Sequence, residues 1–350
     1  MSLQDGWAAL NLEMPKRVPR TEYSVDQHWE LVKVVTGRDV SVHSPDAEKR
    51  QASEAFAKAW NFDYIWSVMV SDNYMHGRKT DMGHAVYAAG GVDRREAQAS
   101  PFVTPDDVFD FDPMEEYGRL PNLEAEFTKA YENNCRRFPD AVNSSGVYIT
   151  MFSGFIAAFG WEMLLLAAGS DPKRFGEVAQ RYEAWIQQFF EAFANTDIPV
   201  MMCHDDLCWT SGPVLNPAWY REYVFPAYKR LWRPVLESGK KILFTSDGDY
   251  TMFIDDIAAC GAHGFALEPC TDMQYIADNF GQTHAFIGNA DTRVLLAGSR
   301  DEIRQEVERC MAIGKHCPGF FMAVGNHIPA NTPVENALFY NEVYEELSQR

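Results

Sequence analysis

Short apolar segments that end in polar residues recur along the whole chain. Most are rich in β-branched or aromatic residues and stay apolar at successive positions, which is typical of strands buried on both faces of a parallel sheet. We predict eight such strands, at Arg17–Tyr23, Tyr64–Val70, Val147–Met151, Ile198–Cys203, Ile242–Phe244, Gly264–Leu267, His284–Ile287 and Phe320–Val324.

Amphipathic helical patterns lie between most of these strands. Apolar residues recur at spacings of three and four in Lys173–Asn195, Pro217–Glu237, Thr251–Cys260, Asp301–Ile313 and Pro333–Leu347. Repeated alternation of strand and helix predicts an α/β protein with a (β/α)8 TIM-barrel fold. The chain shows no convincing interdomain linker, so residues 1–350 are expected to form one barrel domain.

Residues 74–123 depart from this alternation. The segment is rich in glycine, proline and aspartate and shows no long periodic helix. We predict that it forms an elaborated connection between the second strand and the second helix, with a hairpin and a loop over the barrel mouth.

The charge and the cysteines narrow the class of protein. A formal net charge of −19 argues against a nucleic-acid or anionic-membrane partner. The sequence shows neither a signal-peptide pattern nor an apolar run of about 18 residues, so a cytoplasmic protein is expected. The seven cysteines include no C-x-x-C pair, so the sequence suggests neither a disulfide framework nor a cysteine-only zinc site.

Polar residues at the carboxyl ends of the strands are the candidate site, because these ends build the active sites of TIM barrels. The residues expected there are Glu22, Asp72, His204, Asp205, Asp206, Asp247, Glu268, Asn289, Asp291 and His327. For Asp205, Asp249 and Asp291, capping of the following helix is an equally good explanation. For Asp247 we favour the site, because Gly248 permits the close backbone approach that a ligand needs.

Histidines and aromatic residues add candidate chemistry. A histidine such as His327, together with acidic strand ends, can hold a divalent metal, although a hydrogen-bonded loop residue is an equally good explanation. His76 flanks a loop with Arg78 and Lys79 and can contact substrate or solvate that loop. Aromatic residues near the strand ends are expected partly in the core and partly around a cavity for a flat ligand; they are Tyr23, Trp29, Trp66, Tyr74, Phe152, Phe155, Phe159, Trp161 and Trp209.

Several motifs together resemble the uroporphyrinogen decarboxylase superfamily, which includes cobalamin-dependent methyltransferases. They are RVPRTEYS, VSDNYM, DDLCWTSGPVLNPAWYREYVFPAYKRL, FTSDGD, LEP, GNADTRVLL and GNHIPANTPVEN, which extend over nearly the whole chain. The resemblance implies the same barrel fold, and a homodimer is a further expectation. In the decarboxylases an Asp of an FSDIL-like segment holds pyrrole nitrogens, and Asp72 matches that position. Their arginine-rich RQAGRYLPE segment corresponds here to RTEYSVDQH, which lacks the second arginine.

The methyltransferase branch is more similar. Its thiol-methylating members bind zinc through His-x-Cys and a later Cys, where this chain has Thr245-Ser246-Asp247 and Asn326-His327. Related members move a methyl group from a phenyl methyl ether to Co(I) of a separate corrinoid protein. For those that resemble zinc enzymes with oxygen and nitrogen ligands, the matching candidates here are Asp247, Glu268 and His327.

The resemblance therefore implies a corrinoid-dependent methyltransferase acting on an O-methylated aromatic compound. The leaving phenolate oxygen must be protonated or bound to a Lewis acid, for which zinc or a neutral carboxyl group would serve. Candidate catalytic residues are Asp72, Asp206 and Asp247, and candidate substrate contacts are Glu22, Tyr74, His76, Phe152 and Asn289. The alternatives are a decarboxylase and a binding module without catalysis.

Overall fold

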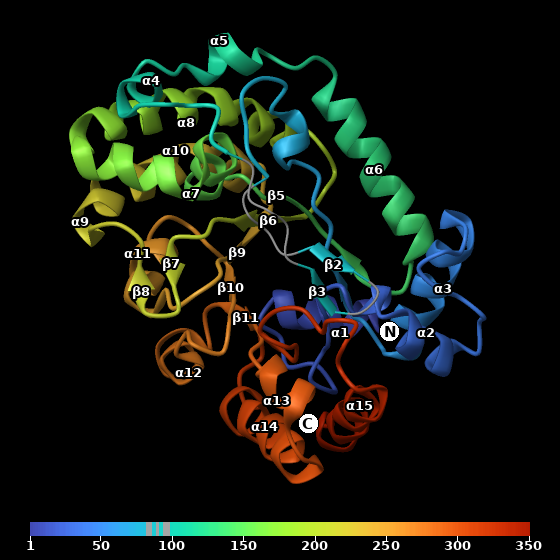
Figure 1. Ribbon diagram of the computed structural model, residues 1–350. Coiled ribbons are helices and arrows are strands. Elements are labelled where there is room, and N and C mark those ends of the chain that lie inside the picture. The colour runs from blue at the N-terminus through green and yellow to red at the C-terminus, as the bar shows by residue number, and fades with distance from the viewer. Residues whose placement is uncertain (82–85, 89–90, 94–98) are drawn as a thin grey trace.

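The computed structural model describes residues 1–81, 86–88, 91–93 and 99–350 as a single α/β barrel (Figure 1). Short parallel strands lie at its centre and helices surround them. A parallel sheet has the order β12-β11-β10-β9-β6-β5, and β1 pairs with β4. These strands are β1 (Tyr64–Ile65), β4 (Val142–Asn143), β5 (Ser145–Val147), β6 (Val200–His204), β9 (Lys241–Thr245), β10 (Gly264–Ala266), β11 (Ala285–Ile287) and β12 (Phe320–Phe321).

Residues 17–23 form the first strand of the barrel. They lie between the second strand, β1, and the eighth strand, β12. The backbone N–H of Asp63 donates to the Arg20 carbonyl at 2.8 Å, and that of Met322 donates to the Pro19 carbonyl at 2.8 Å. Tyr23 and His327 form a further parallel bridge. The predicted TIM barrel is therefore confirmed, although its first strand is held by isolated bridges and its second is short.

The third strand was predicted in the wrong place. The structure puts it at β4 and β5, whereas the predicted Val147–Met151 continues from β5 into a turn before α7 (Phe152–Ser170). The segment that forms the strand contains Asn143, Ser144 and Ser145, which are polar although buried. No apolar run therefore marks this strand in the sequence, which explains the error.

Helix α7 is also the one described helix that is long and apolar enough to cross a membrane. In its most apolar window 67% of the residues are buried within the protein. Phe155 packs edge-on against Phe175 and Tyr182 of α8 (Pro172–Ala194). These contacts identify α7 as a helix of the protein core.

The predicted helices are found close to their expected bounds. They are α8, the continuous series α9 (Pro217–Trp219), η3 (Tyr220–Val224) and α10 (Phe225–Glu237), the pair η4 (Thr251–Phe253) and α11 (Ile254–Ala258), α14 (Arg300–Gly314) and α15 (Val334–Leu347). The remaining helices are α1 (Leu3–Leu10), η1 (Val25–Gln27), α2 (Trp29–Thr36), α3 (Asp46–Ala59), η2 (Asp72–Tyr74), α4 (Pro105–Phe109), α5 (Pro113–Tyr117), α6 (Leu123–Arg137), α12 (Met273–Phe280) and α13 (Thr292–Ala297).

The hairpin expected within residues 74–123 is present. Strands β2 (Val86–Ala88) and β3 (Gly91–Asp93) pair in antiparallel register. Residues 82–85, 89–90 and 94–98 lie outside the described part, and so does His84. A second small antiparallel pair, β7 (Cys208–Trp209) and β8 (Gly212–Pro213), follows β6.

Helix α1 covers the amino-terminal end of the barrel. Its residues Ala9 and Leu10 pack in one buried cluster with strand residues such as Tyr64, Val142 and Val200. The Cβ of any residue larger than glycine at position 6 would lie 2.5 Å from the Asp63 carbonyl oxygen, so α1 sits directly against the strand start. The opposite, carboxyl end of the barrel therefore remains available for a site.

Candidate active site

A cavity of about 570 Å³ opens at the carboxyl ends of the strands. Part of its wall is aromatic: the rings of Tyr23 and Trp66 stack at 4.9 Å, and Tyr64 meets Trp66 edge-on at 5.0 Å. His204, Asp247 and His327 also line the cavity. A flat apolar ligand and a polar reacting group can thus be held in one space.

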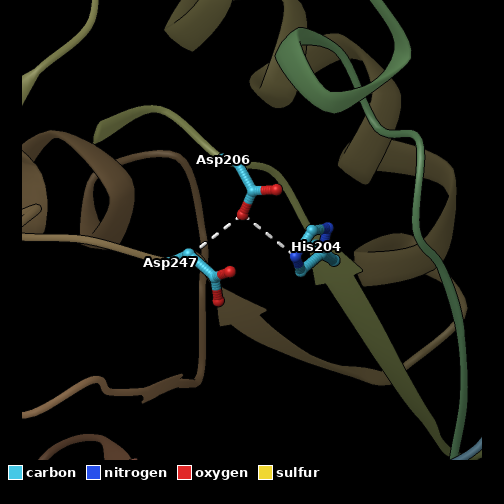
Figure 2. Close-up of side chains that lie close together, drawn as sticks. All are labelled: His204, Asp206 and Asp247. Atoms are coloured by element: carbon cyan, nitrogen blue, oxygen red, sulfur yellow. Dashed lines mark hydrogen bonds and ion pairs between the residues drawn. The ribbon is translucent and has the colours of Figure 1, made fainter. Parts of the chain in front are cut away.

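His204, Asp206 and Asp247 form a compact cluster, which we call the HDD cluster (Figure 2). His204 is the last residue of β6 and pairs in register with Thr245 of β9, so the two polar segments that follow these strands lie side by side. The Oδ1 atom of Asp206 lies 3.0 Å from His204 Nε2 and accepts the Asp247 backbone N–H at 3.1 Å. The Asp206 carboxylate therefore connects the two strand ends.

A second layer of contacts orients this cluster. His204 Nδ1 lies 3.0 Å from the Tyr148 carbonyl oxygen, and the two rings stack at 3.8 Å with an interplanar angle of 3°. Because a carbonyl only accepts, Nδ1 carries the hydrogen and Nε2 faces the carboxylates. The backbone N–H of Asp206 donates to Ser153 Oγ at 2.8 Å.

Burial and the charges within the cluster shift the pKa values of His204 and Asp247. Burial disfavours the charged form of His204, but the neighbouring Asp206 and Asp247 outweigh it and raise the pKa of His204 to about 9. Burial and then the charge of Asp206 raise the pKa of Asp247 to about 7, against the opposing effect of His204. The Asp247 side chain is accessible from the cavity, yet the surrounding protein limits its solvation.

The turn that carries Asp247 depends on Gly248. Its φ of +79° belongs to the left-handed region, and a Cβ at this position would lie 2.4 Å from the Cys208 carbonyl oxygen. The close approach that we expected for a ligand is thus made by the protein backbone. Gly248 N–H donates to Glu268 Oε2 at 2.7 Å, and Asn326 Nδ2 donates to Glu268 Oε1 at 2.5 Å. Glu268 therefore ties together the loops that follow β9, β10 and β12.

The capping alternative holds for neighbouring aspartates. Asp249 accepts from the backbone N–H of Thr251 at 3.0 Å, and Asp291 accepts from that of Arg293 at 2.8 Å. Asp205 does not cap the following helix: it is fully buried and accepts from the Ser153 backbone N–H, at the first turn of the preceding helix α7, at 2.6 Å. Burial raises the pKa of Asp205 to about 6 in spite of these donors.

Glu22 lines the cavity but is engaged by the protein on several sides. It forms an ion pair with Arg20 at 3.0 Å and accepts from Tyr340 Oη at 2.8 Å and from the Val324 backbone N–H at 2.9 Å. Burial, opposed by Arg20, raises the pKa of Glu22. The position is consistent with a structural brace beside the cavity.

Two predicted substrate contacts lie away from the central cavity. Phe152 is fully buried and packs against Phe155 and Tyr220, because residue 152 begins a core helix rather than ending a strand. Asn289 is buried; its Nδ2 donates to the Glu268 carbonyl at 3.2 Å and its Oδ1 accepts from Arg309 at 3.0 Å. Phe152 thus packs in the core, and Asn289 connects neighbouring loops.

The residues predicted after the second strand also point elsewhere. Asp72 pairs with Lys79 at 3.1 Å, Tyr74 contacts Glu126 at 3.3 Å and packs on Phe189, and His76 is exposed. Tyr74 thus contacts α6 and α8, which carry Glu126 and Phe189. The structure therefore brings together Asp206 and Asp247 of the predicted acids, and leaves Asp72 outside their cluster.

His204 was expected among the polar strand ends but was given no catalytic or binding role, and Tyr148 was not expected at the site. A signal for His204 was present, since His204-x-Asp206 directly follows a strand and places two donor side chains at one strand end. Tyr148 was hidden, because the predicted third strand included it as a strand residue. Of the predicted metal ligands Asp247, Glu268 and His327, Asp247 belongs to the HDD cluster and the other two lie outside it.

Comparison with known proteins gives a family match and a fold match. Residues 98–347 match the family described as "Uroporphyrinogen decarboxylase (URO-D)". Uroporphyrinogen decarboxylase from Syntrophotalea carbinolica is 33% identical over 138 residues, which are 39% of this chain and 40% of that protein. The enzyme of the same name from Pelobacter propionicus is 29% identical over 140 residues, 40% of this chain and 41% of that protein.

The matched part of the chain thus spans about two fifths of the length of these relatives. Among solved structures, a methyltransferase from Methanosarcina mazei superimposes with a TM-score of 0.68 over 99% of both chains, at 16% sequence identity. At this identity the likeness shows a shared fold.

Proposed function

The chain belongs to the uroporphyrinogen decarboxylase family, and from this premise we propose that it is a methyltransferase. The proposed reaction moves a methyl group from an O-methylated aromatic compound to Co(I) of a corrinoid protein. One observation carries the proposal: an aromatic wall and the HDD cluster share a single cavity at the carboxyl end of the barrel.

The charge of the cavity favours this reaction over decarboxylation of a substrate with many carboxylates. Glu22, Asp26 and Asp247 line the cavity, and Arg137 is the one arginine among its described lining residues. Arg137 already pairs with Glu54 at 2.6 Å. A polyanionic macrocycle would therefore meet repulsion without a cluster of arginines to offset it.

The aromatic wall suits a methoxylated ring. Tyr23 and Trp66 stack at an interplanar angle of 28°, and Tyr64 meets Trp66 edge-on at 81°. Offset stacking and edge-on contact are the two arrangements in which aromatic groups attract a further ring. A volume of about 570 Å³ is within the ordinary range for small-molecule sites. With the ring on this wall, the ether oxygen can face the HDD cluster.

The chemistry requires help at that oxygen. As the cobalt nucleophile forms a bond to the methyl carbon, the carbon–oxygen bond breaks and its electron pair remains on the phenolate oxygen. His204 holds a proton beside the carboxylates, and Asp247 presents its carboxyl group to the cavity, so this cluster can stabilise or protonate the developing negative charge. Zinc, when bound by N and O donors here, would supply Lewis-acid activation of the same oxygen.

The proposal also covers the methyl acceptor and the location of the protein. The methyl acceptor is the corrinoid of a separate protein, which must reach the cavity from the carboxyl side of the barrel. The proposed location is the cytoplasm, in agreement with the burial of the single described membrane-length helix. A homodimer remains a prediction.

The second candidate function is decarboxylation, which the names of the similar proteins favour. The two reactions are separated by incubating the purified protein with free cob(I)alamin and a panel of methoxybenzenes, and separately with uroporphyrinogen III. We expect loss of the Co(I) absorbance together with release of a phenol, and no release of CO2. Release of CO2 without phenol formation would overturn the proposal in favour of the decarboxylase. Asp247→Asn is the matched variant and is expected to lose phenol release.

A further inference from the structure

The geometry points to a metal site: we infer that His204, Asp206 and Asp247 together bind one divalent transition-metal ion. The inference rests on the proposed function for its chemical use, but its geometry is independent of it. It replaces the ligand set Asp247, Glu268 and His327 that the sequence resemblance implied.

The donor atoms are already gathered. One ligand atom from each of His204, Asp206 and Asp247 lies within 4.8 Å of the others, among the described residues. They come from adjacent strand ends, β6 and β9, which are locked in register by the backbone ladder. An imidazole nitrogen with two carboxylate oxygens is a donor set that Zn²⁺ and similar first-row ions accept, whereas Mg²⁺ and Ca²⁺ prefer oxygen alone.

The second layer resembles that of a metal ligand. His204 Nδ1 donates to the Tyr148 carbonyl oxygen at 3.0 Å, and the parallel Tyr148 ring at 3.8 Å prevents the imidazole from turning. A metal-binding histidine is typically fixed in this way, with its other nitrogen directed at the ion. The buried side chain thus holds Nε2 toward both carboxylates.

Charge balance favours a cation. The cluster gathers two carboxylates and an imidazole at a poorly solvated position in a chain of net charge −19. Two carboxylates held this close together are stabilised when they share a cation. A divalent ion would neutralise both carboxylates with a neutral imidazole as the third ligand.

The alternative ligands Glu268 and His327 fit the metal less well. Both oxygens of Glu268 accept from loop donors, Gly248 N–H at 2.7 Å and Asn326 Nδ2 at 2.5 Å. His327 lines the cavity but is not part of the cluster of closely spaced donors. Three protein ligands also leave a coordination position for the ether oxygen, as in catalytic zinc sites.

The test uses the full-length protein, freed of metal by a chelator and dialysis, and ZnCl2 as the probe. Calorimetry should show one Zn²⁺ per chain, and the thermal midpoint of unfolding should rise with Zn²⁺. Asp247→Asn and Asp206→Asn should weaken Zn²⁺ binding at least tenfold, whereas Glu268→Gln and His327→Gln should bind like the wild type. MgCl2 should bind more weakly than ZnCl2.

Circular dichroism of each apo variant separates loss of the site from loss of the fold. Absence of Zn²⁺ binding by the wild type would overturn the inference, and so would loss in Glu268→Gln with retention in folded Asp247→Asn. Binding that follows the expected variants, without methyl transfer from any methoxybenzene, would refute the proposed function and leave the metal site standing. Methyl transfer by a protein that binds no Zn²⁺ would refute the metal site alone.

Discussion

Substitution of single side chains at the cavity can separate substrate binding from catalysis. Trp66 contributes the ring that both Tyr23 and Tyr64 contact. Trp66→Leu is expected to raise the KM for a methoxybenzene about threefold to tenfold and to leave kcat nearly unchanged, since stacking acts equally in ground and transition states. Steady-state kinetics measures both constants. A fall in kcat at constant KM would show that Trp66 acts on the reacting atoms instead.

Asp205, behind the cavity, depends on a neighbouring hydroxyl group. Tyr228 donates a short hydrogen bond to this fully buried carboxyl group. Tyr228→Phe removes the donor and should lower the free energy of unfolding by about 1–3 kcal/mol, as measured by urea denaturation. Tyr182→Phe is the matched control, because Tyr182 Oη donates to the neutral Ile149 carbonyl at 2.7 Å. The free energy of unfolding should fall less in Tyr182→Phe than in Tyr228→Phe. Equal losses in the two variants would contradict a special dependence of Asp205 on Tyr228.

At the scale of single residues, the sequence predicted which side chains lie at the strand ends better than it predicted which of them lie together. Asp206 and Asp247 were identified because each follows a strand directly, and the structure places them in one cluster. Glu268 has the same sequence pattern, but its carboxylate is used to join loops, which depends on the backbone donors of Gly248 and the side chain of Asn326. Such a distinction requires the fold, since no local pattern says which donors a loop leaves unsatisfied.

A contact between two neighbouring strands makes the stability of the protein depend on pH. His263 precedes β10, and its Nδ1 accepts the Ile242 backbone N–H from β9 at 3.2 Å. Burial, with repulsion from Lys241 and His284, lowers the pKa of His263 to about 4 from an ordinary 6.5. The unfolded chain therefore binds this proton more tightly. The stabilising contribution is fully present above pH 6.5 and is lost as the pH falls toward 4.

The prediction is a loss of up to about 3 kcal/mol from this group between pH 6.5 and 4. His263→Asn keeps an acceptor for Ile242 without a titrating group, so its unfolding free energy should fall less over the same interval. Urea midpoints at several pH values measure the difference between the two proteins. This comparison is needed because Asp63 and Asp205, whose pKa values are raised to about 6, contribute with the opposite sign. Parallel pH profiles would refute the role of His263.

Elements were predictable where periodicity and length agreed. The long amphipathic pattern at 173–195 matches α8 to within a residue, and the apolar runs at 198–203 and 242–244 match β6 and β9 closely. The failure at 147–151 arose because the strand lies at 142–147, where Asn143, Ser144 and Ser145 are buried but polar. Without an apolar run, such a strand cannot be recognised from the sequence.

Across the whole molecule, the two ends of the chain meet to close the barrel. In Figure 1 the N-terminal helices lie beside the C-terminal helix α15. The fully buried Arg20 guanidinium lies over the rings of Trp60, Tyr344 and Tyr340 at 4.4, 4.7 and 5.1 Å. Its partner Glu22 binds Tyr340 of α15 and the backbone of Val324. One buried ion pair thus joins the first strand, the last helix and the segment after the last strand.

Glu22→Leu should therefore destabilise the entire barrel rather than one region. It leaves the buried charge of Arg20 without its counterion, and such a break costs about 3–5 kcal/mol. Urea unfolding, followed both by tryptophan fluorescence and by far-UV circular dichroism, should show one common transition at a lower midpoint. Lys33→Ala, which removes the exposed pair with Asp39, is the control and should leave the midpoint unchanged. If the two signals separate in Glu22→Leu, the chain ends unfold independently of the rest, and Glu22 braces a local contact instead of the closed ring. A variant as stable as the wild type would instead show that the aromatic rings around Arg20 suffice to hold its charge.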